Sequence, residues 1–356
     1  MERKTRIACI VASAMAGVLI AGQRPRAEAW NDRGHCVVAQ VAYRQLSPKA
    51  QDEAIRILKA DKTPKSKCVY DQLKEAIGGF VEDPEDFREC LFEKAATWPD
   101  LIRGNDAESM DDWHFINLAI KPDPHAGGAP AQDLTATLAE NAGRNDVKNA
   151  VQALQWNARM LVKPQANAHE KARALCWVMH LVGDVHQPLH CAALVTAAFP
   201  EGDRGGGWFR VKDPTLADPP QNDNLHKFWD RGLGLIDRAK PFADVFGPVV
   251  AQADDLLARL PRTQTNVKAG LAQDAKIRAK SPAAELAEPL YLSWAKKSRD
   301  LAETWAYAIG NGTVAPIAPG GTLDDDYVSH ARDLAEKRAT LAGYRLADLL
   351  NRLLDK

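Results

Sequence analysis

The sequence predicts an all-α protein with a single, mostly helical domain. Apolar residues recur at three- and four-residue spacing along almost the whole chain of 356 residues, and no convincing run of alternating residues predicts strands. A hydrophobic content of 46% is enough for a large core and excludes disorder as the main state. The balance of 46 Lys and Arg against 47 Asp and Glu also argues against proteins that hold nucleic acid on a broad basic surface.

Helix start signals and a long apolar stripe support this fold class. Ser47-Pro48 and Ser281-Pro282 each place a capping hydroxyl before a proline, which predicts that helices start at these two points. A closing amphipathic helix is predicted by a stripe made of Leu334, Leu341, Ala342, Leu346, Leu349, Leu350 and Leu353. Loops are expected where Gly and Pro gather, at 121–130, 199–221 and 315–322. None of them is typical of a domain linker.

The first 29 residues are typical of a secretory signal peptide. Basic residues precede an apolar run from Ile7 to Ile20, and Ala27-Glu28-Ala29 provides a small-x-small cleavage pattern. A membrane anchor is the alternative, but the run is shorter than the roughly 20 residues that span a bilayer. We therefore expect export to the periplasm or the medium, with residues 30–356 as the mature domain. Cleavage would change the formal charge from −1 to −4 and make Trp30 the new N-terminus.

Five of the six cysteines lie in the expected mature chain, where an exported protein can form disulfides. Cys68 and Cys90 flank a charged, loop-rich insert and are the best candidate pair. Cys36 and Cys191 directly follow histidines of interest, and packing alone would explain them. The fifth is Cys176. Because the number is odd, at least one of the five stays unpaired.

Two His-x-x-x-Asp pairs carry the strongest chemical signal. His180 and Asp184 are four residues apart, as are His226 and Asp230, so each pair projects from one face of a helix and suits a metal ion. Pro188 should end the first helix and let His190 approach from another direction. One such pair is weak evidence, because a salt-bridged helix shows the same spacing. Two pairs together with His190 are considerably stronger.

Three upstream segments add further donors. These are 30–35, which contains Trp30 and His35; 98–103, which contains Asp100 and Arg103; and 113–117, which contains His114, Phe115 and Asn117. Alone, each is more often ordinary core. Together the chain offers five histidines and three aspartates, a mixed set that suits zinc and is too large for one tetrahedral site. Two or three metal ions are expected.

These segments together resemble the secreted zinc-dependent single-strand nucleases and 3′-nucleotidases of the mung bean nuclease type. The resemblance covers nearly all of the expected mature chain, including the closing segment 341–351. It implies a helical fold around a trinuclear zinc cluster, similar to that of phospholipase C. It also implies that the first zinc is held by Asp100, His114, His180 and Asp184, the second by His190, His226 and Asp230, and the third by Trp30, His35 and the other oxygen of Asp184.

The resemblance also implies a reaction and substrates. Asp100 and Asp184 belong to the catalytic centre, where a hydroxide shared by metals about 3.5–4 Å apart attacks phosphorus and Arg103 neutralises the charge on the phosphoryl oxygens. Phe115 matches the base-stacking aromatic residue and Asn117 the residue that hydrogen-bonds base edges, although Phe115 could also be plain core. The expected substrates are single-stranded DNA, RNA and 3′-nucleotides, with 5′-phosphate products from the strands and a monomeric enzyme.

Some residues depart from the family pattern or stand outside it. Gly207 replaces the usual asparagine in a glycine loop, and Lys297 replaces an acidic residue before Ser298. These departures bear on substrate range, since none removes a proposed ligand. Of the other histidines, His125, His169 and His330 are expected at the surface or in caps. His186 is expected behind the ligands or exposed.

Two other functions fit the same donors. A zinc phospholipase C is similar in fold, but it separates its N-terminal tryptophan and first histidine more widely and ends its ligand set with glutamate instead of an aspartate such as Asp230. A non-enzymatic zinc-storage protein would saturate its sites with protein ligands, whereas the second expected site has only three.

Overall fold

The computed structural model describes residues 30–355 apart from 65–67, 79–83, 105–109, 123–127, 129–136, 218, 236–239, 241, 282 and 310–316. The expected signal peptide and His125 lie outside the described residues. In the part that is described, the chain forms eleven α-helices and two small sheets of two strands each. No described helix is both long and apolar enough to cross a membrane.

The helices confirm the mostly α-helical prediction. They are α1 (Asp32–Tyr43), α2 (Pro48–Ala60), α3 (Val69–Ile77), α4 (Pro84–Leu101), α5 (Ala150–Val162), α6 (Ala168–Asp184), α7 (Leu225–Asp230), α8 (Phe242–Arg259), α9 (Thr265–Lys280), α10 (Glu288–Leu301) and α11 (Asp325–Leu354). The 3-10 turns η1 (Asp111–His114) and η3 (Pro188–Cys191) and the π-turn η5 (Ala302–Ala306) complete the parts that matter below.

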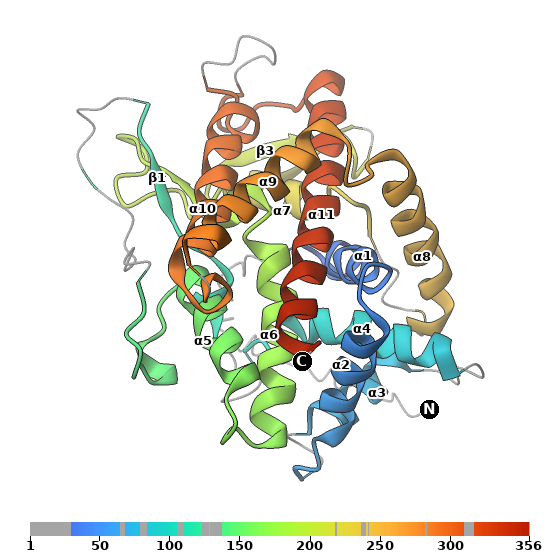
Figure 1. The fold of residues 1–356 in the computed structure, drawn as a ribbon. Helices are drawn as coiled ribbons and strands as arrows, with labels where there is room; N and C mark the ends of the chain where they lie inside the picture. Colours follow the sequence, from blue (N-terminus) through green and yellow to red (C-terminus); the bar gives the residue numbers. More distant parts are fainter. Residues whose placement is uncertain are drawn as a thin grey trace, which may run out of the picture.

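Helix α6 is the central element of the fold. Its residues from Ala172 to Asp184 are all buried, and it packs against α2, α4, α5 and α11 (Figure 1). The predicted closing helix is α11, and most of its leucine stripe is buried, although Leu334 is only partly so. Helix α11 approaches α1 so closely that a Cβ on Gly343 would lie 2.3 Å from Val41 Cγ1. The two helices therefore need glycine at their contact.

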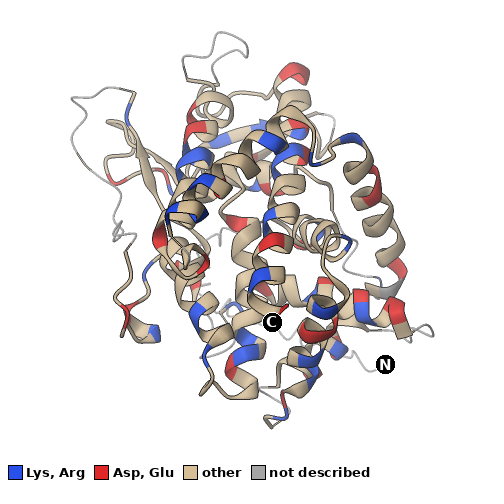
Figure 2. Ribbon diagram, viewed as in Figure 1, with Lys and Arg blue, Asp and Glu red and all other residues tan. Residues whose placement is uncertain are grey.

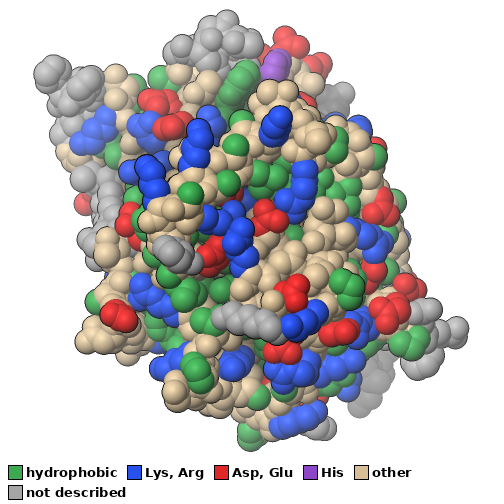
Figure 3. All heavy atoms as spheres, viewed as in Figure 1, with side chains coloured by type: hydrophobic (Ala, Val, Ile, Leu, Met, Phe, Trp, Pro, Cys, Tyr) green, Lys and Arg blue, Asp and Glu red, His purple; other side chains and the backbone are tan. Residues whose placement is uncertain are grey.

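Buried apolar side chains form two clusters. The larger surrounds α6, and the smaller joins the β3–β4 hairpin to α7 and the start of α11. Leu189 belongs to the smaller cluster and Cys191 to the larger one, so His190 between them lies where the two meet. Acidic and basic residues are interspersed along the ribbon (Figure 2), and their side chains mix on the face drawn in Figure 3.

Several local predictions are corrected. Ser47 does cap α2, but Ser281 ends α9, and the next α-helix starts only at Glu288, where Pro289 occupies the first turn. The expected loop 199–221 contains the strand β3 (Arg210–Asp213) and the first residue of β4 (Gln221–Asn224). A second small sheet pairs β1 (Leu118–Ile120) with β2 (Ala192–Leu194) in parallel. Most of the expected loop 121–130 lies outside the described residues.

The expected disulfide is not formed. The five described cysteines are all buried free thiols. The Cys68 thiol donates to the carbonyl oxygen of Asp61 at 3.3 Å, while Cys90 lies buried in the larger apolar cluster. Spacing along the chain did not determine how these two side chains point.

Candidate metal centre

Helix α6 presents the first predicted pair on one face. Its N-terminus is fixed by a capping box between Asn167 and Glu170, and its last turn ends at Asp184. The Nε2 atom of His180 lies 3.2 Å from Oδ2 of Asp184, and both side chains are fully buried. The predicted one-face geometry is therefore present.

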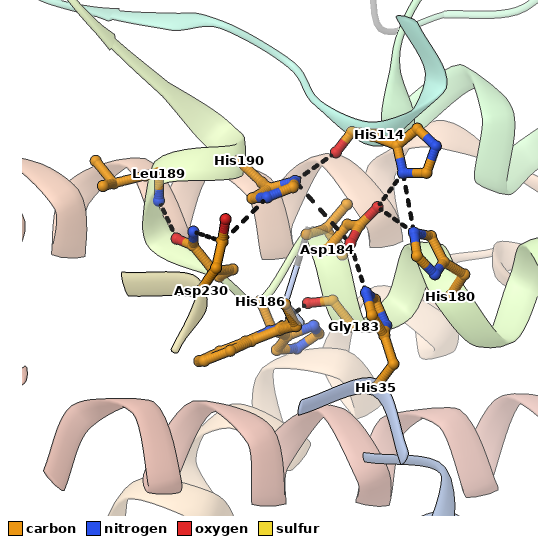
Figure 4. A network of polar contacts seen from close by, with 12 residues as sticks. His35, His114, His180, Gly183, Asp184, His186, Leu189, His190 and Asp230 are labelled. Carbon is orange, nitrogen blue, oxygen red and sulfur yellow. Dashed lines mark hydrogen bonds and ion pairs between the residues drawn. The ribbon is translucent and has the colours of Figure 1, made fainter. Parts of the chain in front are cut away.

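The two oxygens of Asp184 face different histidines (Figure 4). Oδ2 lies 3.3 Å from His114 Nδ1, in addition to its contact with His180. Oδ1 lies 3.4 Å from His35 Nε2 and 4.0 Å from His190 Nδ1. A carboxylate placed in this way can give one oxygen to each of two neighbouring metal ions.

A second group lies on the far side of His190. His190 Nε2 lies 3.1 Å from His226 Nε2 and 3.6 Å from Asp230 Oδ1. His226 Nε2 lies 3.5 Å from Asp230 Oδ2. Tetrahedral zinc with bonds of about 2.05 Å needs ligand atoms about 3.3 Å apart. These three separations are of that size.

Asp100 and His35 lie beside the first group. Asp100 Oδ1 is 3.8 Å from His114 Nδ1 and 3.9 Å from His180 Nε2. The His35 ring stacks on the His180 ring with a centroid separation of 3.8 Å. His35, Asp100 and His180 could themselves hold an ion, as could His114 with His180 and Asp184. Chain segments far apart in sequence thus converge on Asp184.

Backbone carbonyls fix the orientation of three of the rings. The Nδ1 atoms of His180, His190 and His226 each lie 2.7 Å from a carbonyl oxygen, those of Ala96, His114 and Gly205 respectively. A carbonyl can only accept, so each Nδ1 must donate, which leaves Nε2 as the atom that faces the cluster and can bind a cation. Histidines that bind metals are held in this way.

The electrostatics of the cluster favour ionised carboxylates. Burial alone opposes ionisation of Asp184, but His180 and His190 outweigh it and hold the pKa of Asp184 well below its ordinary value. Burial lowers the pKa of His114 to about 3, so its imidazole is neutral. Burial also lowers the pKa of His190, but Asp184 and Asp230 outweigh this and raise it to about 9. A cation entering the cluster would therefore displace a proton from His190.

Buried polar atoms without a hydrogen-bond partner test whether a metal fits. Most buried polar atoms are paired, so a concentration of unpaired ones needs an explanation. Within the described part of the chain, the unpaired atoms of this cluster are both ring nitrogens of His35, Asp100 Oδ1, His114 Nε2, both oxygens of Asp184 and Asp230 Oδ2. All seven are carboxylate oxygens or imidazole nitrogens, the donors that zinc prefers. The residues fit a group of zinc ions.

The remaining predicted residues border this cluster. The buried Trp30 side chain donates from Nε1 to the Gly183 carbonyl at 3.0 Å, next to Asp184. Arg103 Nη1 lies 3.6 Å from Asp100 Oδ1, and its side chain is mostly buried. Phe115 and Asn117 are half-buried. The residue between them, Ile116, donates its N–H to the His190 carbonyl at 2.8 Å, which ties this segment to the cluster.

Sequence reasoning missed the support for His226. Asp203 is fully buried, and its oxygens accept from the N–H groups of Leu194 and Gly206 and from the Tyr307 hydroxyl. These bonds shape the glycine loop whose Gly205 carbonyl orients His226. Gly205 has φ +60°, and an added Cβ would lie 2.2 Å from the Leu189 carbonyl. The run of glycines in the sequence indicated an unusual loop. That the loop orients His226 could not be read from it, because His226 lies 21 residues after Gly205.

Sequence reasoning also missed a buried clamp behind Asp184. His186 is fully buried, not exposed, and its Nε2 accepts from Arg345, which Asp274 holds with both oxygens. Arg338 donates to the His186 carbonyl and to Ser298, whose hydroxyl donates to the Val185 carbonyl. Helices α9, α10 and α11 thereby fix the turn that follows α6.

The other two described histidines lie outside the cluster. His169, in the first turn of α6, pairs with the buried Asp61 at 2.9 Å. His330 is exposed on α11 and stacks on Trp305.

Comparison with known proteins decides the family. The model of a family described as S1/P1 Nuclease matches residues 30–355. The chain belongs to the S1/P1 nuclease family. Its match begins at Trp30 and includes every residue of the cluster.

Individual S1/P1 relatives are distant. Endonuclease 4 of Arabidopsis thaliana is 30% identical over 51% of this chain and 50% of its own length, and Endonuclease 3 of the same plant is 24% identical over 91% and 88%. Nuclease S1 of Aspergillus oryzae is 29% identical over 39% and 40%. The matched part spans about half the length of the first two plant relatives, Endonuclease 4 and Endonuclease 5.

Proposed function

We propose that this chain is an exported, zinc-dependent phosphodiesterase and phosphomonoesterase. It hydrolyses single-stranded DNA and RNA to 5′-phosphate products and 3′-nucleotides to nucleosides. The observation that carries the proposal is the position of Asp184, whose two oxygens face two sets of histidines while the His190 group lies alongside. Membership of the S1/P1 nuclease family supports the same chemistry.

Three zinc ions are proposed, each with its own set of ligands. Asp100, His114, His180 and Asp184 would hold the first, and His190, His226 and Asp230 the second. The third would be held by His35, Asp184 and the backbone of Trp30, whose indole lies against the residue before Asp184. When bound, zinc supplies Lewis-acid activation of water and of phosphoryl oxygens at neutral pH.

The chain's own residues bind and orient the substrate. Arg103, next to Asp100, would neutralise charge that develops on the phosphoryl oxygens. Phe115 would stack on an unpaired base, and Asn117 would hydrogen-bond its edge. Both lie within three residues of His114, and Ile116 between them bonds to His190, which places the base beside the cluster. A paired base cannot enter such a pocket, so a preference for single strands follows.

Export and assembly state complete the proposal. The basic, apolar and small-residue pattern of residues 1–29 supports a signal peptide, and the family match from residue 30 agrees with its removal. The mature protein would act as a monomer in the periplasm or the medium.

An activity panel with zinc analysis tests this proposal. Protein starting at Trp30 should contain three zinc ions by mass spectrometry, cleave denatured DNA and RNA, and release phosphate from 3′-AMP. His226→Asn should abolish these activities, whereas His330→Asn, on an exposed histidine outside the cluster, should not. Hydrolysis of phosphatidylcholine alone would overturn the proposal in favour of a zinc phospholipase C. Zinc binding without any hydrolysis would favour storage.

A further inference from the structure

An exposed stripe follows the glycine loop that orients His226. From Trp208 to Asp213, exposed and buried residues alternate, as expected where one face of an extended chain is covered. Trp208, Arg210 and Lys212 are exposed, and Phe209, Val211 and Asp213 are buried. Trp208 is 44% exposed, although tryptophan is mostly buried in proteins. Arg210 and Lys212 therefore share the exposed face of β3, and the exposed Trp208 lies just before the strand.

Arg204 adds a third cation to this stripe. Its guanidinium carbon lies 4.5 Å from the centroid of the Trp208 ring, within the range of a cation–π contact. Arg204 also has φ +58°, a conformation that costs energy for a residue other than glycine. Strained residues of this kind cluster at binding sites.

Nearby acidic groups do not neutralise the stripe. In the part of the chain that the structure describes, Arg204, Arg210 and Lys212 form no ion pair. Asp213 and Asp223 both pair with Arg231 instead. Asp203 is buried against Tyr307, and Glu201 is the exposed acid nearest in sequence. Across the hairpin, Lys212 faces Asn222, a neutral hydrogen-bonding side chain.

The stripe is attached directly to the metal centre. The Phe209 carbonyl oxygen accepts a hydrogen bond from the Leu225 N–H at 2.9 Å, and the Gly206 carbonyl oxygen accepts one from the His226 N–H. Strand β3 packs beside α7, which carries His226 and Asp230 (Figure 1). At about 3.3 Å per residue, the segment 208–212 extends roughly 13 Å onward.

We propose that Arg204, Trp208, Arg210 and Lys212 form a separate binding site for single-stranded nucleic acid. Trp208 stacks on a base that lies outside the metal centre, and the three cations contact the phosphates of the same strand. Single-strand sites combine aromatic platforms with basic grooves in this way. The inference rests on the proposed function and deepens it, because it makes affinity depend on the length of the substrate.

Comparing a long oligonucleotide with 3′-AMP tests the stacking. Trp208→Ala should raise KM for the oligonucleotide about tenfold or more and leave kcat unchanged. KM for 3′-AMP should not move, because a single nucleotide held at the metal centre has no second base to stack on Trp208. Trp208→Phe, which keeps an aromatic ring, should restore most of the affinity. An unchanged KM for the oligonucleotide, or an equal rise for both substrates, would overturn the site.

Salt dependence tests the cations. Arg210→Ala with Lys212→Ala should reduce the slope of log Kd against log salt by about 1.4, as expected for the loss of two phosphate contacts. Lys276→Ala with Lys280→Ala removes the same charge from the exposed face of α9 and serves as the control. Binding is measured by fluorescence anisotropy with a cleavage-resistant phosphorothioate strand. This measurement does not require hydrolysis, so it tests the site even if the chain hydrolyses nothing. Equal competition by polyglutamate would show a general polyanion surface and overturn the proposal.

Discussion

The carbonyl oxygen of Gly205 accepts a hydrogen bond from Nδ1 of His226 at 2.7 Å. This contact fixes which ring nitrogen faces the metal group, and it depends on a backbone conformation that favours glycine.

Replacing Gly205 by alanine should therefore disturb the His190–His226–Asp230 group. The new Cβ would collide with the Leu189 carbonyl, at a residue next to His190. We expect a loss of about 2 kcal/mol or more in unfolding free energy and less bound zinc. Thermal unfolding and zinc analysis measure both. Gly143→Ala, whose Cβ would come no closer than 3.5 Å to another group, is the control. Equal losses in the two variants would contradict the argument.

Tyr307→Phe should weaken zinc binding without emptying every site. The variant removes the hydroxyl that lies 2.7 and 2.9 Å from the two oxygens of Asp203. Outer groups of this kind are worth about 10- to 100-fold in metal affinity. Chelator competition should show one weakened ion while those near Asp184 stay tight. The control is Tyr344→Phe, which removes a buried hydroxyl that donates to the Leu260 carbonyl and not to Asp203. This variant should keep the zinc affinity of the parent.

Asp184→Asn should empty the centre more completely. Asparagine keeps the shape but removes the negative charge that faces His35, His114 and His180. We expect at least two zinc ions to be lost and hydrolysis to fall by a factor of about 1000 or more. Mass spectrometry of the native protein counts the ions. Retention of all three zinc ions would exclude the bridging position of Asp184.

Glu93→Gln should change how stability depends on pH. Neither oxygen of Glu93 has a hydrogen-bond partner among the described residues, and burial, with Glu89 nearby, raises its pKa well above 4.5 despite Arg44 and Lys94. Above pH 4.5 the unfolded chain loses this proton while the folded chain keeps it, so stability falls as pH rises. Urea unfolding should show that the free energy of unfolding of the variant rises relative to that of the parent between pH 5 and pH 8. The same change at the exposed Glu140 should leave the profile unaltered.

An extension before Trp30 tests the proposed third zinc. If the free amine of Trp30 binds this ion, one additional residue at the N-terminus should remove it and most of the activity. The first two ions should remain, because their proposed ligands lie elsewhere. Full activity and three zinc ions in the extended protein would exclude this role.

The four-residue spacings of His180 with Asp184 and of His226 with Asp230 predicted both pairs, because helix geometry alone determines which face such residues share. Asp203 and Arg345 could not be found in this way, since their partners Tyr307 and His186 lie far along the chain. Ser281 misled because it ends α9, whereas α10 starts later, with Pro289 in its first turn and no capping side chain. Strands of three or four residues are too short to show a period.

The clamp behind Asp184 also sets an order of assembly. Arg338 and Arg345 lie on α11, which follows every candidate ligand in the chain. During synthesis, all the ligand residues leave the ribosome before the helix that fixes the turn after Asp184 is complete. The candidate metal centre is thus complete only once the whole chain has been translated, and a chain cut before α11 would keep every candidate ligand but lose the contacts that hold the turn after Asp184.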